Sequence, residues 1–276
     1  MKRTLLVINS NSGNANLIDE DVLAAAFEAG GFRIISRVSL PDEDLPTRAV
    51  LEAPAFDTVA VCAGDGTVSS LCANLAGWEG DVLVLPGGTM NLLSRRLHGE
   101  LGLPEVVDLL PNVSASASPI PIIKTGDTEI LTGLTVGPST RWGKVREDIR
   151  QADISSLSET VPEAWSETLS DDGVWLDGAQ REAYAGIFIE PFDGENLKVL
   201  AFRANSLGDM VSHGLAWLRH DFREGPHDEL GLMKTATVIG DPIETGILVD
   251  GEYEDRLLPL TCRAAMSSVR FLRTAP

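Results

Sequence analysis

The sequence is short of cysteine and of positive charge. Its three cysteines, Cys62, Cys72 and Cys262, stand in apolar surroundings without metal-ligand spacing, so core packing is their expected role. Lysine and arginine number 22 against 41 aspartates and glutamates, which gives a formal net charge of −19. This charge argues against nucleic acid as a partner and disfavours simple electrostatic adsorption to anionic lipid.

Long apolar runs are also missing. No run approaches the roughly 18 uninterrupted apolar residues of a membrane span. The N-terminus, MKRTLLVINSNSG, holds an apolar stretch of only about five residues before it turns polar, which predicts a first strand rather than a signal peptide. We therefore expect a cytoplasmic protein.

What the sequence does contain is a strand that ends in a glycine turn. Residues 59–62 are apolar, residues 63–67 read Ala-Gly-Asp-Gly-Thr, and apolar side chains then recur at helical spacing up to residue 75. Glycine permits positive φ and lets bare backbone approach a ligand. The first N–H groups of a helix have no internal partner, so such a turn is a natural anion site. Asp65 suits a metal or a hydroxyl proton; the alternative is an ordinary turn with a capping aspartate.

A second glycine turn follows the next apolar run. Residues 82–85 predict a buried strand, residues 86–91 read Pro-Gly-Gly-Thr-Met-Asn, and a helix with Leu92, Leu93 and Leu97 follows. Two such turns at neighbouring strand ends are what an open α/β sheet needs to form one crevice. Strands at 4–8 and 32–40 and helices at 19–28 and 41–52 complete an alternation that predicts a mostly parallel sheet over residues 1 to about 110.

The pattern changes after residue 112. Residues 113–121 read as a linker, and short alternating runs then predict a mainly antiparallel β domain, with strands at 129–136, 185–189, 197–202, 236–239, 246–249 and 268–272. Residues 141–170 are polar and predict some helix. Residues 207–222 predict a helix packed on the β domain, or alternatively a lipid-facing one. We expect two domains, at 1–118 and 119–276.

Taken together, the turns resemble the diacylglycerol kinase catalytic-domain family, which includes bacterial soluble lipid kinases and the sphingosine and ceramide kinases. The family's Gly-Gly-Asp-Gly-Thr turn is matched at 63–67, and its Pro-x-Gly-Thr-x-Asn turn, followed by a small residue and arginine, at 86–95. Its Asn-Pro-x-x-Gly turn is matched loosely at 9–13, an Asp-Gly segment at 193–194, and its late Asp-Gly-Glu at 250–252. Ala63, Ser10 and Glu195 depart from the family pattern.

The resemblance implies an N-terminal α/β domain, a C-terminal β-sandwich, and ATP bound with Mg²⁺ in the cleft between them. It implies Glu252 as the base that receives the acceptor's proton, with Asp65 as its rival or as a magnesium ligand, and a further metal near Asp193 and Glu195. The nucleotide-binding residues that it implies are Asn9, Ser39, Ala63, Gly64, Asp65, Gly66, Thr67, Gly88, Thr89 and Asn91. Asn91 either fixes the second turn or reaches the nucleotide. The alternative for both Asp-Gly pairs, at 193 and at 250, is a plain hairpin turn.

Three functions remain open from the sequence. The first is an ATP-dependent lipid kinase, with diacylglycerol as the leading acceptor and a sphingoid base or ceramide next. The second is an enzyme similar to NAD kinase with a soluble acceptor, and the third is a nucleotide-binding regulator without catalysis. As partners we expect a nucleotide, a lipid at the inner face of a membrane and a possible second copy of the chain, but no nucleic acid.

Overall fold

The chain folds into two units, and its last residues return to the first. One unit comprises Met1–Ile120 and Met266–Pro276, and the other comprises Pro121–Ala265. The computed structural model describes residues 1–12, 19–53, 55–112, 117–140, 173–179, 182–203, 227–241 and 243–274. The helices expected within 141–170 and 207–222 lie outside these ranges.

The first unit is built on a parallel sheet. Its strand order is β16-β4-β3-β1-β2, and every neighbouring pair runs parallel. Both β3 and β4 are buried along their whole length, as a sheet covered on both faces requires. The predicted α/β class is therefore confirmed. The strands are β1 (Lys2–Asn9), β2 (Phe32–Leu40), β3 (Thr58–Ala63), β4 (Asp81–Pro86) and β16 (Arg270–Phe271).

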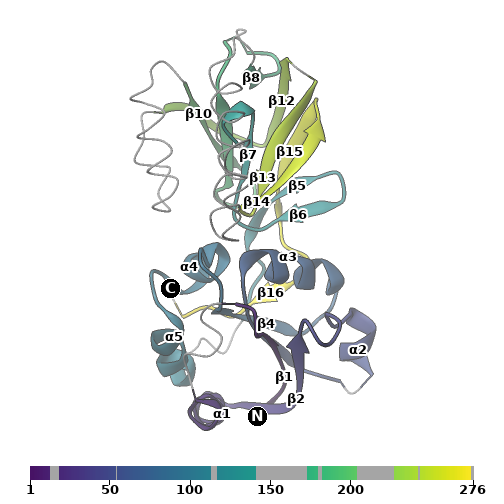
Figure 1. Cartoon of the computed structure of the whole chain (residues 1–276), viewed down its shortest axis with the longest axis vertical. Coiled ribbons are helices and arrows are strands. Elements are labelled where there is room, and N and C mark those ends of the chain that lie inside the picture. Colours follow the sequence, from purple (N-terminus) through teal and green to yellow (C-terminus); the bar gives the residue numbers. More distant parts are fainter. Residues whose placement is uncertain are drawn as a thin grey trace, which may run out of the picture. The chain divides into compact units, whose positions relative to one another are not determined.

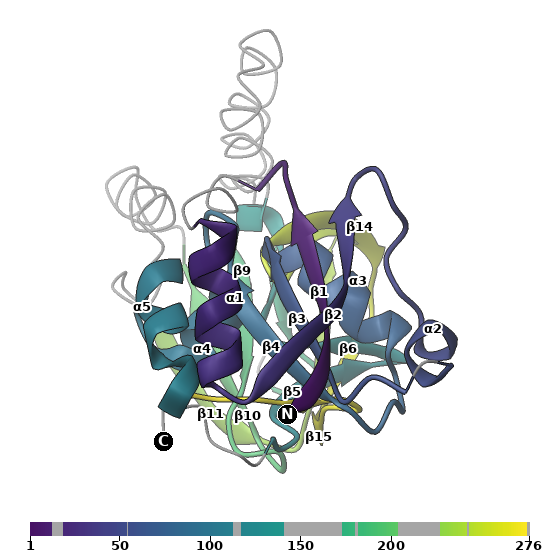
Figure 2. The ribbon, with the colours of Figure 1, turned by 90° about the horizontal axis from the view of Figure 1, so that it is seen from below.

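Helices cover both faces of this sheet. Side chains of α1 and α5 join one core cluster with alternate residues of β1, β3 and β4, while α3 lies on the opposite side (Figure 2). The helix expected over 41–52 is wrong in its first half. Only α2 (Arg48–Glu52) is helical, because Pro46 holds the residue before it extended. The other helices are α1 (Glu20–Ala29), α3 (Asp65–Asn74), α4 (Leu92–His98), α5 (Leu103–Leu109) and the 3-10 turn η1 (Leu110–Asn112).

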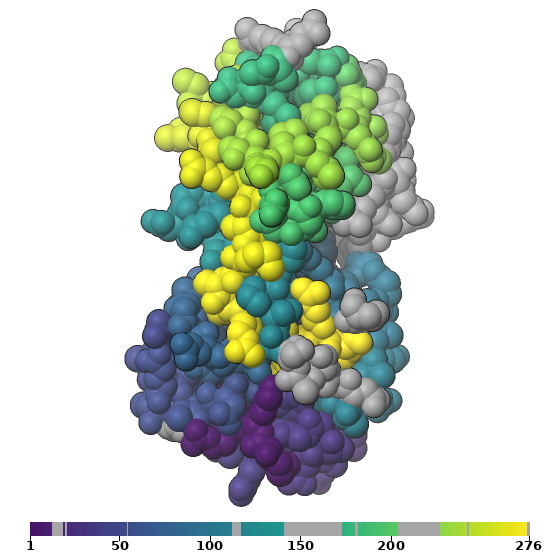
Figure 3. Space-filling model, turned by 180° about the vertical axis from the view of Figure 1, so that it is seen from behind, coloured from purple at the N-terminus to yellow at the C-terminus, as the bar shows by residue number. Residues whose placement is uncertain are grey.

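Strand β16 corrects a second expectation. The sequence suggested that residues 268–272 belong to the β domain, but β16 pairs in parallel with β4, in the register Arg270↔Asp81 and Phe271↔Val82. Phe271 is fully buried, and the next residue, Leu272, joins the core cluster of α1 and α5. Figure 3 shows atoms of the yellow, C-terminal end of the chain among the blue and purple atoms of the first unit.

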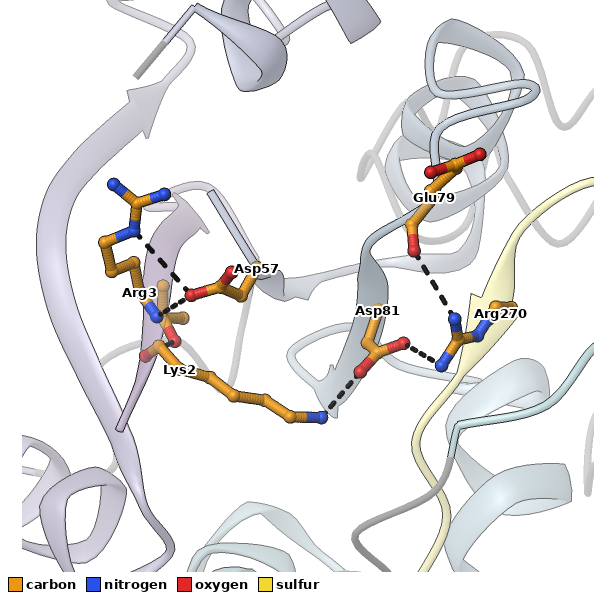
Figure 4. A network of polar contacts seen from close by, with 7 residues as sticks. Lys2, Arg3, Asp57, Glu79, Asp81 and Arg270 are labelled. Carbon is orange, nitrogen blue, oxygen red and sulfur yellow. Dashed lines mark hydrogen bonds and ion pairs between the residues drawn. The ribbon is translucent and has the colours of Figure 1, made fainter. Parts of the chain in front are cut away.

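An ion network ties β16 to the amino ends of β4 and β1 (Figure 4). The carboxylate of Asp81, which is 8% exposed, lies 2.6 Å from Nζ of Lys2 and 3.0 Å from a guanidinium nitrogen of Arg270. Asp57 accepts a hydrogen bond of 2.7 Å from the backbone N–H of Arg3. This network stands at the strand ends opposite to the glycine turns, so its role is structural.

The second unit is a β-sandwich of two sheets (Figure 1). The six-stranded sheet has the order β11-β10-β9-β7-β13-β14 with every pair antiparallel, and the five-stranded sheet has the order β6-β5-β15-β12-β8. Inward side chains of both sheets share one buried core. The predicted antiparallel β class is confirmed.

The first sheet of the sandwich consists of β7 (Leu134–Val136), β9 (Gly186–Pro191), β10 (Leu197–Phe202), β11 (Asp228–Met233), β13 (Glu244–Val249) and β14 (Glu252–Leu257). The second consists of β5 (Pro121–Thr125), β6 (Thr128–Ile130), β8 (Gly173–Leu176), β12 (Thr235–Asp241) and β15 (Leu260–Met266), and the 3-10 turn η2 (Pro138–Thr140) follows β7.

The cysteines serve the cores, as expected. All three are buried and none forms a disulfide. Burial raises the pKa of Cys62 to about 11 and that of Cys262 to about 12, so neither thiol is a ready nucleophile. Within the described ranges, no helix combines the length and the apolar character that crossing a membrane requires.

Candidate active site

The two glycine turns lie side by side at the carboxyl edge of the parallel sheet. Strands β3 and β4 are neighbours, and the register Ala63↔Pro86 brings both turns to the same height. A Cβ atom built on Gly88 would lie 2.5 Å from Cα of Gly64, and one built on Gly87 would lie 2.5 Å from the backbone nitrogen of Ala63. These distances are too short for any side chain. The turns therefore pack backbone against backbone.

Close approach, and not an unusual backbone angle, is what requires glycine here. Gly64 has a φ of −76°, which any residue adopts. The described residues with positive φ include Asn91 but no glycine of either turn. The glycines of these turns do not use the positive φ that glycine permits; they allow the two backbones to approach each other closely.

The first turn opens directly into α3. Gly64 is its N-cap residue, and the first helical hydrogen bond runs from the N–H of Val68 to the carbonyl of Gly64, at 3.1 Å. Among the described residues, the backbone N–H groups of Gly66 and Thr67 have no hydrogen-bond acceptor. N–H groups without an acceptor at the positive end of a helix dipole are the donors that an anion-binding site requires.

The second turn is closed by its own asparagine. Asn91 takes the left-handed conformation, with φ 51° and ψ 42°. Its Oδ1 accepts from the N–H of Gly88 at 2.7 Å, and its Nδ2 donates to the carbonyl of Gly88 at 2.9 Å. Of the two roles open from the sequence, fixing the turn is the one seen here. The N–H of Gly88 is already used inside the turn, while Thr89 is exposed.

Asp65 links the two turns. Its Oδ1 accepts a hydrogen bond of 3.2 Å from the backbone N–H of Leu93, in the first turn of α4. Gly64, the N-cap residue of α3, has no side chain that could cap the helix. The carboxylate thus stands between the start of α3 and the start of α4, where it fits a single-carboxylate contact to a phosphate-bound Mg²⁺.

The two remaining candidates of the first unit lie on β1 and β2. Asn9 ends β1, and its Nδ2 donates to Oγ1 of Thr67 over 3.3 Å, so it joins the first glycine turn. Ser39 is exposed near the end of β2, on the far side of β1, and its N–H donates to the carboxylate of Glu43 at 2.7 Å. The structure brings Asn9 to the turn but records no bond from Ser39 to it.

The Asp-Gly-Glu segment of the second unit forms a hairpin. Val249 pairs with Glu252 across a two-residue loop in which Asp250 and Gly251 both have positive φ, 49° and 90°, as a type I′ turn requires. The hairpin alternative is therefore correct for the backbone. It leaves a role for Glu252 open, because this side chain is exposed at the first position of β14.

Asp250 has a structural role that sequence reasoning missed. Its buried carboxylate accepts hydrogen bonds from the N–H groups of Leu131, Thr132 and Gly133, at 2.7 to 3.3 Å, and from the Thr132 hydroxyl at 2.7 Å. The Asp-Gly pair signals the turn, but no local pattern signals a partner 118 residues away. Asp250 thereby fixes the turn from which Glu252 extends.

The carboxylates of Asp193 and Glu195, the expected metal ligands, have partners within the chain, and their role as metal ligands stays a prediction. The carboxylate of Asp193 accepts from the N–H groups of Glu195 and Asn196 and from the Asn196 side chain, at 2.7 to 3.2 Å. These bonds, led by the one from the Asn196 side chain, lower the pKa of Asp193. Glu195 is exposed and lies 3.9 Å from Lys234. In the described part of the chain, no three histidine, cysteine or acidic side chains gather as a metal would require.

A family model matches nearly all of the continuous N-terminal part of the first unit. Residues 3–124 match the family model of the diacylglycerol kinase catalytic domain. This match confirms the resemblance that the glycine turns indicate. No curated protein matches the chain.

Solved structures match the whole chain. A structure described as a diacylglycerol kinase from Bacillus anthracis str. Sterne superposes with a TM-score of 0.62 at 18% identity, covering 98% of this chain and 96% of that one. A structure of a candidate diacylglycerol kinase from the same strain gives a TM-score of 0.65 at 16% identity, over 99% and 97% of the two chains. At these identities the likeness establishes the fold.

Proposed function

We propose that this chain, whose residues 3–124 match a diacylglycerol kinase catalytic domain, is an ATP-dependent lipid kinase. It transfers the γ-phosphoryl group of ATP to a hydroxyl of a membrane-derived lipid. Diacylglycerol is the first acceptor to test, and a sphingoid base or ceramide is the next. The protein acts from the cytoplasm at the inner membrane face.

One observation carries this proposal: two glycine turns packed backbone against backbone beside the start of α3. Phosphoryl transfer depends on positioning and on neutralising charge more than on covalent chemistry by the protein. The N–H groups of Gly66 and Thr67, which have no acceptor among the described residues, supply donors for phosphate oxygens. The adjoining turn, closed by Asn91, provides a rigid wall rather than a further donor at Gly88.

Asp65 and Glu252 have different proposed roles in the reaction. Mg²⁺, when bound, neutralises phosphate charge, and Asp65 is its proposed ligand, directly or through water. Its bond to the Leu93 N–H also keeps the two turns together. Glu252 is the proposed base that takes the acceptor's hydroxyl proton; a weak base is adequate because the proton leaves late in a loose transition state. Asp193 and Glu195 have no proposed step in the reaction, and their role as ligands of a further, structural metal stays a prediction.

The test is a phosphoryl-transfer assay with γ-labelled ATP and Mg²⁺. The acceptors are diacylglycerol, ceramide and sphingosine in detergent micelles, with NAD as a soluble acceptor. Labelled lipid supports the proposal, and label on NAD alone supports the soluble-acceptor enzyme instead. ATP binding without any label supports a regulator and contradicts the proposed function.

Matched variants test the base. Glu252→Gln removes the proposed base, while Glu254→Gln removes a second carboxylate two residues along β14, on the same face of the strand, which is paired with Arg256. We expect the first variant to abolish transfer and the second to transfer as the wild type does. Equal turnover of the two variants would contradict the role of Glu252.

A further inference from the structure

The side chain of Asn9 forms a hydrogen bond with Thr67 of the first glycine turn, and the donor and the acceptor of this bond can be assigned. Strands β1 and β3 are parallel neighbours in the register Ile8↔Cys62, so both end at the same edge of the sheet. There, Nδ2 of Asn9 lies 3.3 Å from Oγ1 of Thr67. Asn9 therefore reaches α3 through a side chain that itself belongs to the proposed phosphate site.

The other end of the same amide fixes its orientation. Oδ1 of Asn9 accepts from the backbone N–H of Asn11 at 3.0 Å. A backbone N–H only donates, so the oxygen must face Asn11 and the NH₂ group must face Thr67. An amide NH₂ only donates, so the Thr67 hydroxyl is the acceptor in this bond and keeps its own hydrogen for another partner.

That remaining hydrogen is what a phosphate needs. Phosphate oxygens at neutral pH accept hydrogen bonds, and the neighbouring N–H groups of Gly66 and Thr67 have no acceptor among the described residues. A threonine hydroxyl near a helix start otherwise turns toward a backbone carbonyl three or four residues earlier. By donating to Oγ1, Asn9 favours the arrangement in which the hydroxyl hydrogen points away from Asn9.

We propose that Asn9 is a positioning residue for the nucleotide: it holds the Thr67 hydroxyl as a donor to a phosphate oxygen of ATP and acts through Thr67. This role differs from a direct contact between Asn9 and ATP. It rests on the proposed function, because it takes ATP as the ligand of the glycine turn.

A double-mutant cycle separates the two roles. ATP affinity in the presence of Mg²⁺ is measured by titration calorimetry for the wild type, Asn9→Ala, Thr67→Val and the double variant. A hydrogen bond to a charged acceptor is worth about tenfold in affinity, so each single variant should bind ATP about tenfold more weakly. If Asn9 acts through Thr67, the double variant also loses about tenfold. A loss of about a hundredfold means independent contacts and overturns the proposal.

Two further variants add tests of the positioning role of Asn9. Asn9→Asp keeps an acceptor for Asn11 but draws the Thr67 hydrogen to itself, so it should weaken ATP binding more in the wild-type background than with Thr67→Val. An equal loss in both backgrounds overturns the proposal even if Asn9→Ala fails to fold. Thr67→Ser keeps the hydroxyl, so adding Asn9→Ala to this variant should again weaken ATP binding, whereas adding it to Thr67→Val should not.

The control is Ser10→Ala in the same turn. The Ser10 hydroxyl donates to the carbonyl of Leu40 at 2.9 Å, away from Thr67, so its removal should leave ATP affinity unchanged. Thermal melts of every variant exclude unfolding as the cause of a loss. A wild-type protein that binds no ATP overturns the proposed function and the positioning role with it. ATP binding with additive losses overturns the positioning role alone.

Discussion

A methyl group at Gly88 should force the two glycine turns apart. The Cβ of a Gly88→Ala variant would lie 2.5 Å from Cα of Gly64, whereas carbon atoms in contact normally lie about 3.5 to 4.0 Å apart. One turn must therefore move by about 1 Å or more, and because the obstacle is backbone, no rotamer change relieves it. We expect a loss of about 1 to 3 kcal/mol in the free energy of unfolding. We also expect roughly 100-fold slower phosphoryl transfer, since an error of about 1 Å in position has that effect.

Gly64→Ala is the matched control for stability. Its Cβ would meet Cα of Gly88 at 3.8 Å, an ordinary contact, and its φ of −76° suits alanine. Only the weaker N-cap preference of alanine remains, at about 1 kcal/mol or less. Urea denaturation measures both free energies, and the labelled-ATP assay measures turnover of the Gly88 variant. Gly88→Ala being as stable as Gly64→Ala, with normal turnover, would refute the backbone-to-backbone packing.

Three further predictions concern acids and a histidine. Asp65→Asn keeps an oxygen for the Leu93 N–H, so the free energy of unfolding should change by less than about 0.5 kcal/mol while transfer is lost; a melt and the labelled-ATP assay check both. Asp250→Ala leaves buried N–H groups unsatisfied and should cost about 2 to 4 kcal/mol in urea denaturation; a cost near zero contradicts its anchoring role. Burial lowers the pKa of His98, so the unfolded chain takes up its proton first. The free energy of unfolding should keep its value above about pH 6.5 and decrease below it because of His98. Thermal melts of His98→Gln should show a smaller decrease in stability below that pH.

The meeting of the two turns was predictable from the sequence, but their packing was not. Two fully apolar runs that each end in glycine indicate neighbouring parallel strands, whose ends share one edge of the sheet. The reason for glycine depends on the register Ala63↔Pro86. Register is a property of the assembled sheet, so the sequence alone did not show that these glycines pack against each other.

Long-range hydrogen bonds also could not be predicted from the sequence. A local cap was one of the roles open for Asp65, yet its Oδ1 accepts a hydrogen bond from the N–H of Leu93, 28 residues on. Asp250 looked like a turn residue alone, yet it holds a loop 118 residues earlier. Helix and turn patterns describe only a few neighbouring residues, so they predict which local structure an aspartate suits. They do not predict which distant backbone N–H groups the folded chain brings to the carboxylate of that aspartate.

The pairing of β16 with β4 sets an order of events during synthesis. The ribosome releases residues 1–120 first and the whole β-sandwich next, and only then the strand that completes the first sheet. Until Arg270 and Phe271 emerge, β4 has an open edge and Asp81 has one cation instead of two. The unit that starts folding first is thus the last to be finished. A fragment cut between the two units would leave the first unit without its outer strand.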